Sequence, residues 1–193
     1  DVVSGEPRRS CRVVEDETRP ADDTRRITVA QEDRVLENDL TLTPWWLARL
    51  ISRTTTSDFR PSGFALPESG PVACPPLPDP ATSHRKVQGA RYTWHLASAA
   101  AGSRRKLESE ALFGGPAPTV AEAPSCFPDS TAAEARSCFG YDVHGNVATK
   151  RVRARDVLDD AGSPRTLTTT YTASADGYFP STETNPAGHV STV

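Results

Sequence analysis

The chain has 193 residues, of which 36% are hydrophobic and 7% aromatic, with 17 prolines, 12 glycines and a formal net charge of −3. Ordinary globular domains are roughly 45–50% apolar, so this composition argues against a helical bundle or a large autonomous core. No apolar run approaches the roughly 20 residues that a membrane-spanning helix needs. The near balance of 22 basic and 25 acidic residues argues against a nucleic-acid partner, which usually demands a basic stripe.

The first half of the chain divides into three segments. Residues 1–24 are polar and charged, and we expect a poorly ordered lead-in there. Residues 25–56 carry β-branched and Thr-rich stretches that favour strands. Prolines crowd residues 57–88, where the loss of backbone donors and the fixed φ exclude a central strand, so we expect a linker.

Residues 89–193 contain short strand patterns at regular spacing, separated by Gly-containing turn clusters, with an irregular insertion at 113–137. The chain is therefore predicted to be all-β, an antiparallel meander of hairpins with Pro-rich insertions. The expected strands in this half are Gly89–His95, Arg105–Leu112, Cys138–Asp142, Val147–Ala154, Arg165–Thr172, Pro180–Asn185 and His189–Val193.

The chain contains no Met and begins at Asp1. Its last residues, 190–193, belong to a strand pattern that begins directly after a turn. We therefore expect the chain to be a fragment of a longer polypeptide, cut at both ends.

Of the four cysteines, Cys126 and Cys138 occupy two copies of Ser-Cys-Phe that flank a small polar loop. A disulfide across this loop would contribute roughly 3 kcal/mol on the loop-entropy model, provided that the chain reaches an oxidising compartment. The alternative is a set of free or partly buried thiols. No C-x-x-C pair is present, which argues against a zinc ribbon or a thioredoxin-type site.

The sharpest local pattern is a strand, a turn and a returning strand around Tyr141, Asp142, Gly145 and Asn146. Gly145 can adopt positive φ without a Cβ clash, Asn146 tolerates it, and Asp142 can accept hydrogen bonds from the backbone N–H groups that follow it. Any β-hairpin could use these residues.

The order Tyr-Asp-x-x-Gly-Asn followed by an alternating strand also resembles the YD repeat of the Rhs family of large bacterial proteins. A second stretch, 168–190, is similar to the same repeat, although Thr172, Tyr178 and Pro186 stand where the repeat usually has Asp, Arg and Ala. Weaker likenesses lie upstream in 25–56 and 89–112. In the second stretch the matching residues are Tyr171, Gly177, Pro180, Asn185, Gly188 and His189.

The resemblance implies a non-enzymatic structural segment of a secreted or cell-surface protein. In this family the repeats form a β-sheet shell that encloses or presents a C-terminal toxin or effector. The partners implied are neighbouring repeats of the same polypeptide and an enclosed toxin domain. Repeat architecture also accounts for the composition, because each unit buries one face against its neighbours and builds no core alone.

The residues offer no enzyme chemistry. The four histidines are scattered without metal-ligand spacing, Asp159-Asp160 reads as a solvated loop, and no phosphate loop or EF-hand loop occurs. We therefore expect no catalytic, cofactor-binding or metal-binding residue. The alternative function is a carbohydrate-binding or adhesive extracellular module that stacks a surface glycan on aromatic residues, namely Trp45, Trp46, Tyr92 and Trp94.

Overall fold

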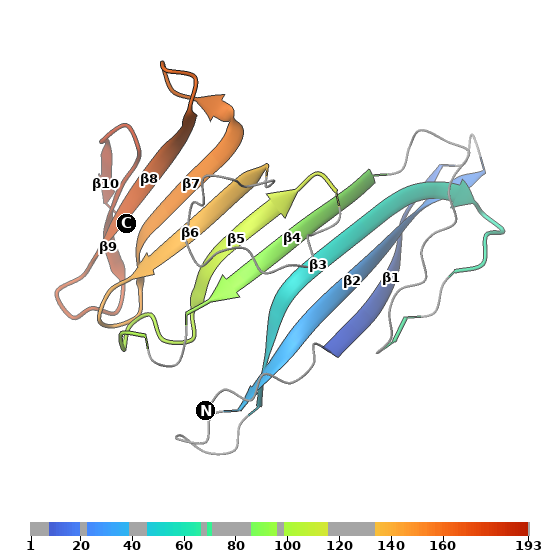
Figure 1. Cartoon of the computed structure of the whole chain (residues 1–193), viewed down its shortest axis with the longest axis horizontal. Helices are drawn as coiled ribbons and strands as arrows, with labels where there is room; N and C mark the ends of the chain where they lie inside the picture. Colours follow the sequence, from blue (N-terminus) through green and yellow to red (C-terminus); the bar gives the residue numbers. More distant parts are fainter. Residues whose placement is uncertain are drawn as a thin grey trace. The chain divides into compact units, whose positions relative to one another are not determined.

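A computed structural model describes residues 8–19, 23–38, 46–66, 69–70, 86–95, 99–115 and 134–192; the side chains of 15–19, 36–38 and 46–47 are not described. The described residues form ten strands and no helix, and the strand order is the chain order from first to last (Figure 1). The strand bounds are β1 Arg8–Arg19, β2 Thr24–Asn38, β3 Trp46–Pro61, β4 Lys86–Trp94, β5 Leu107–Phe113, β6 Ala135–Tyr141, β7 Val147–Leu158, β8 Pro164–Ala173, β9 Pro180–Thr184 and β10 Val190–Thr192.

All recorded strand pairs are antiparallel, which confirms the prediction of an all-β antiparallel meander. The chain separates into two compact units, Asp1–Arg91 with Gly114–Thr119, and Tyr92–Phe113 with Val120–Val193. The division falls inside β4. It does not fall in the Pro-rich stretch 57–88, into which β3 extends as far as Pro61.

In the first unit β2 pairs with β1 on one side and β3 on the other, over almost its full length. The expectation of a poorly ordered lead-in is wrong for residues 8–19, which form β1. The physical reason lies between β1 and β2, because Arg9 Nε donates to Asp33 Oδ1 at 2.7 Å and Cys11 packs with Ile27 and Val29 of β2. A cross-strand ion pair and a shared apolar cluster both stabilise neighbouring strands of a sheet.

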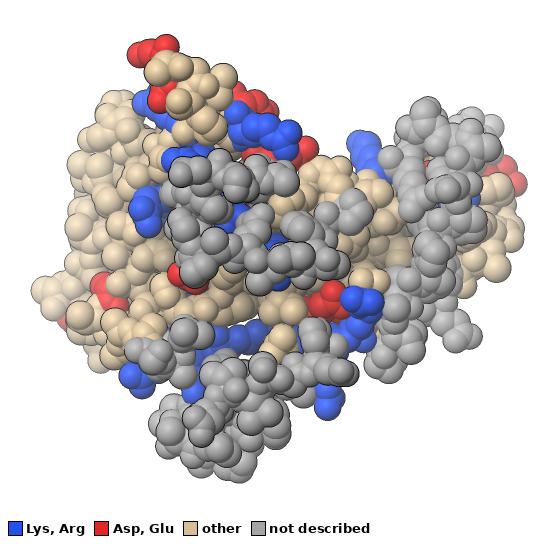
Figure 2. All heavy atoms as spheres, viewed as in Figure 1, with Lys and Arg blue, Asp and Glu red and all other residues tan. Residues whose placement is uncertain are grey.

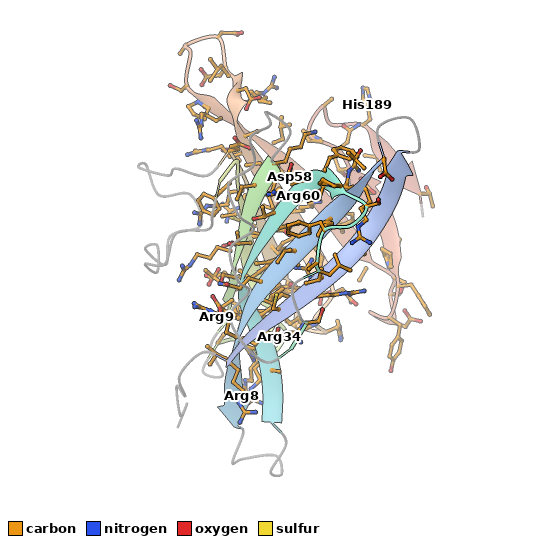
Figure 3. All side chains as sticks on the ribbon, turned by 90° about the vertical axis from the view of Figure 1, so that its right-hand side faces the viewer. Arg8, Arg9, Arg34, Asp58, Arg60 and His189 are labelled. Atoms are coloured by element: carbon orange, nitrogen blue, oxygen red, sulfur yellow. The ribbon has the colours of Figure 1, made fainter. Side chains whose placement is uncertain are left out.

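The core of the first unit is small and consists of Cys11, Ile27 and Val29, with Val13 and Phe64 packed against it. One buried charge also lies on β3. Asp58 accepts a 2.9 Å hydrogen bond from the backbone N–H of Phe59 and pairs with Arg60 at 2.9 Å (Figure 3). The buried Asp58 carboxylate is thus bound by two partners from its own strand.

The second unit continues the meander, with β6 pairing β7, β7 pairing β8 and β9 lying between β8 and β10. Its most buried side chains alternate along β5 and β6 and so share one face of the sheet. These buried side chains are Ser109, Ala111, Phe113, Arg136 and Cys138.

Acidic and basic side chains are interspersed on the face of the molecule seen in Figure 2.

The described part of the chain contains no helix long and apolar enough to cross a membrane.

We expect Ile27→Ala to destabilise the first unit by about 2–5 kcal/mol, because the side chain is fully buried and its removal leaves a cavity. Leu66→Ala is the control, since Leu66 is 42% exposed, and it should shift stability by less than about 0.5 kcal/mol. Urea unfolding followed by circular dichroism measures both. Equal effects from the two substitutions would contradict the assignment of this core.

Candidate functional site

The turn between β6 and β7 is held by the side chain of Asp142. Its Oδ1 accepts hydrogen bonds from the backbone N–H groups of His144 at 2.9 Å and Asn146 at 2.8 Å, and its Oδ2 accepts one from Asn146 Nδ2 at 3.0 Å. The backbone closes the turn as Gly145 N donates to Asp142 O and Asp142 N to Asn146 O. Gly145 has φ +92°, so it takes the left-handed bulge position of a type I hairpin turn.

The same set of bonds recurs at two further turns, 159–163 and 185–189. In each, the first residue uses Oδ1 to accept the backbone N–H groups two and four positions later, at 2.8–3.0 Å. The fourth residue is a glycine with positive φ, +78° at Gly162 and +84° at Gly188. Asp159 and Asn185 therefore do in their turns what Asp142 does in the first.

The turn between β8 and β9, residues 174–179, is a longer variant. Ser174 N donates to Phe179 O at 2.7 Å, Gly177 N donates to Ser174 O at 2.8 Å, and Gly177 has φ +76°. Asp176 accepts from the Ser174 hydroxyl and, at 3.2 Å, from Tyr178 N. The aspartate again serves the backbone of its own turn.

Three loops of the second unit lie against one another at one end of the strands. They comprise residues 99–106, 142–146 and 174–179, and we name them the turn stack. A Cβ on Gly102 would collide with the backbone carbonyl of Asp142. A Cβ on Gly177 would lie 2.7 Å from the His144 ring, and Asn146 Nδ2 donates to Gly177 O at 2.6 Å. Each loop therefore packs on the next through a residue that has no side chain.

Tyr141 anchors the middle of the turn stack. Its hydroxyl donates to Leu107 O at 2.8 Å, Lys106 Nζ lies 5.1 Å from its ring centroid, and the His95 ring meets it edge-on at 5.9 Å. Lys106 Nζ also donates to Gly145 O. Burial raises the pKa of the Tyr141 hydroxyl, so the ring remains a neutral partner for the Lys106 cation.

The carboxylates of the turn stack are engaged as hydrogen-bond acceptors. Desolvation raises the pKa of Asp142, but the bonds from the Asn146 side chain and from the turn backbone outweigh it, so this pKa lies below its usual range. The hydrogen bond from Ser174 and that from the Tyr178 N–H likewise lower the pKa of Asp176. Neither group is poised as a general base near neutral pH.

The remaining residues singled out in the sequence have structural positions. Tyr171 is half-buried on β8 opposite Glu183, Pro180 opens β9 opposite Ala173, and the exposed His189 ends the turn that Asn185 caps. The structure does not bring these residues into one cluster with Asp142.

Cys138 is disulfide-bonded, as is Cys11. Cys126, the partner expected for Cys138, lies outside the described residues, so that pairing stays a prediction. Among the residues that the structure describes, no group of three or more His, Cys, Asp or Glu side chains is placed to hold a metal ion.

The aromatic residues of the glycan alternative are divided. Trp45 lies outside the described residues and the Trp46 side chain is not described, whereas Tyr92 and Trp94 are half-buried on β4.

Two features of the site were missed in the sequence. The sequence predicts a Gly-containing turn around Gly162 but not the cap that Asp159 supplies, although its Asp-x-x-Gly spacing matches that of Asp142. The contacts of Gly102 and Lys106 with the next loop are long-range and leave no local pattern.

No protein-family model matches the chain, and no curated protein or solved structure matches it either.

Five glycines make a graded test of the turn stack. Gly162→Ala and Gly188→Ala meet nothing within 4 Å among the described residues and should cost only the left-handed strain of about 1–2 kcal/mol. Gly177→Ala adds a collision with the His144 ring and should cost more, whereas Gly145→Ala displaces the Lys106 ammonium from Gly145 O and should add a smaller cost. Gly102→Ala has no positive φ and should still destabilise, through contact alone. Unfolding midpoints in urea measure the order, and five equal costs would contradict the packing of the loops.

The low pKa of Asp142 sets the sign of a pH effect. A carboxyl whose pKa is lowered on folding adds stability above its usual pKa, and this contribution is lost as pH falls through the folded value. Asp142→Asn keeps an acceptor for the two backbone N–H groups, as Asn185 does in its own turn, but cannot titrate. We expect this variant to lose less stability than the wild type between about pH 6 and about pH 3. Parallel curves for the two proteins would refute the role of the carboxylate.

Proposed function

We propose that this chain is a non-enzymatic structural segment of an Rhs/YD-repeat protein, forming part of a β-sheet shell that encloses or presents a C-terminal toxin or effector. The observation that carries the proposal is the turn at Asp142, which recurs with the same hydrogen bonds at Asp159 and Asn185. A repeated strand–turn–strand unit is what a wall built by addition of identical pieces requires.

The strand order supports the same proposal. Because each strand pairs with its chain neighbours, further hairpins extend the sheet without rearranging it. Among the described residues the buried apolar side chains are few, which suits a wall that gains its burial from adjoining units. The disulfide bonds of Cys11 and Cys138 support an exported protein, secreted or at the cell surface.

The chemistry of the turn stack also favours a structural role. The carboxylates of Asp142 and Asp176 accept hydrogen bonds from their own turns, and Asn146 bridges two loops. These groups set strand register. The carbohydrate-binding alternative draws no support from the half-buried Tyr92 and Trp94.

The test uses the longer polypeptide that contains this chain. Limited proteolysis should cut between shell and effector and leave the effector intact and co-eluting with the repeats. Gly177→Ala should expose the effector to digestion, because it separates two loops of the wall, whereas Gly188→Ala, in an open turn, should protect it as the wild type does. An effector that is digested equally in all three proteins contradicts the proposed shell.

A further inference from the structure

The strand β1 is the first in the sheet, and among the described strands it pairs only with β2, so its other side is a sheet edge. The backbone N–H and C=O groups of such an edge can pair with another strand, and native sheets often prevent this by covering the edge with a loop. In this chain residues 62–66 and 69–70 follow β3 and turn back beside β1 (Figure 1). We name them the edge strap.

The edge strap forms hydrogen bonds with the middle of the β1 edge. Cys11 N donates to Gly70 O at 2.7 Å and Gly70 N donates to Cys11 O at 2.9 Å, which forms an isolated antiparallel bridge. Val13 N donates to the Ser69 hydroxyl at 2.9 Å. A further strand can therefore pair with this part of β1 only after it displaces Ser69 and Gly70.

The edge strap is also fixed to the core of the first unit, at a different residue. Phe64 packs against the small buried cluster of that unit. Arg25 Nη2 donates to Phe64 O at 2.5 Å, and the Arg60 guanidinium lies 5.2 Å from the centre of the Phe64 ring. The bonds of Ser69 and Gly70 with β1 can thus be removed while the contacts of Phe64 with the core remain.

The sequence of β1 is complementary in charge to a second copy of itself. Its residues 8–12 include three arginines and no acid, whereas residues 15–17 are all acidic. In an antiparallel pair centred on Val13, residues 8–12 of one copy face residues 14–18 of the other. Opposite charges on facing strands stabilise such a pair, and a two-fold axis lets both copies use the same strand. Val13 already directs its N–H to the outer edge, as this pairing requires.

We propose that the edge strap is an autoinhibitory cap and that the β1 edge beneath it is an interaction surface for a second copy of this chain. While Ser69 and Gly70 are bonded to β1, the two copies stay apart. When these bonds are removed, β1 pairs antiparallel with β1 of the second copy and joins the two sheets. The inference does not rest on the proposed shell, because it concerns contacts within the first unit and pairing between two copies of this chain.

The experiment compares the self-association of the 193-residue chain and of its variant S69A/G70P by sedimentation equilibrium. The two substitutions remove the acceptor for Val13 N and the donor to Cys11 O. The variant should form a dimer whose dissociation constant is at least roughly tenfold lower than that of the wild type, because β1 no longer has to give up these bonds. S69A alone, which leaves the backbone unchanged, should strengthen the dimer by a smaller factor. A variant that keeps its strands by circular dichroism and associates no more than the wild type would overturn the proposal.

Charge reversal identifies the surface that pairs. Added to the uncapped variant, E15K/D16K should return the chain to a monomer, because it sets lysines against the basic half of the second copy. Glu15 faces Ile27 in the register of β1 with β2 and Asp16 faces no residue there, so neither lysine is placed opposite a charge on β2. The matched control D156K/D160K makes the same change of net charge at exposed positions of the second unit and should leave the dimer intact. Equal weakening of the dimer by both pairs of substitutions would contradict pairing through β1.

Hydrogen exchange gives an independent readout of the same surface. Alternate residues of a strand direct their N–H groups to the same side, so Arg9 and Glu15 share the outer side of β1 with Cys11 and Val13. The amides of Arg9 and Glu15 should gain protection as the uncapped variant dimerises. Protection gained at β10 alone, the strand at the other edge of the sheet, would refute the proposed surface.

Discussion

The register of the second unit depends on one interaction, the side-chain oxygen of an Asp or Asn that accepts two backbone N–H groups of its own turn. Asp142, Asp159 and Asn185 each make these bonds, and each is followed three residues later by a glycine in the left-handed region. A hairpin that slipped by one residue would turn every side chain to the opposite face of the sheet. The cap and the glycine admit only one closing pair, so they fix the register of β6 with β7, of β7 with β8 and of β9 with β10.

The two ends of the strands in the second unit differ in how closely their turns pack on neighbouring loops. At the turn stack, Gly102 and Gly177 let each loop touch the next, and Lys106 ties Tyr141 to the carbonyl of Gly145. At the other end of the strands, Gly162 and Gly188 occupy the same position in their turns, and no described residue lies close to a Cβ built on either of them. The turn at Asp142 thus closes in the same way as those at Asp159 and Asn185 but stands in different surroundings, because only the first is packed against neighbouring loops through its glycine.

The sequence predicted the parts of the fold that local rules govern. Alternation and turn residues were enough for β6 to β10, because Gly145, Gly177 and Gly188 mark the positions where the chain must reverse. The strand β1 was missed because its few apolar residues, Cys11 and Val13 among them, stand between charged ones, and the side chains on which they pack belong to β2. The contact between His144 and Gly177 leaves no local pattern for a similar reason. The two residues lie far apart in the chain, in loops that only the meander brings together.

The engagement of polar groups in the turns also limits what this surface can do. A carboxylate that holds two N–H groups of its own loop gives up the freedom to move a proton or to frame a polar ligand. At the turn stack, Asp142 accepts two such N–H groups and Asp176 accepts one together with the Ser174 hydroxyl. Tyr178, Phe179 and Arg104 are exposed beside them. The hydrogen bonds that make the turns rigid also keep these carboxylates ionised at neutral pH, so the surface of the turn stack carries exposed apolar side chains beside negative as well as positive groups.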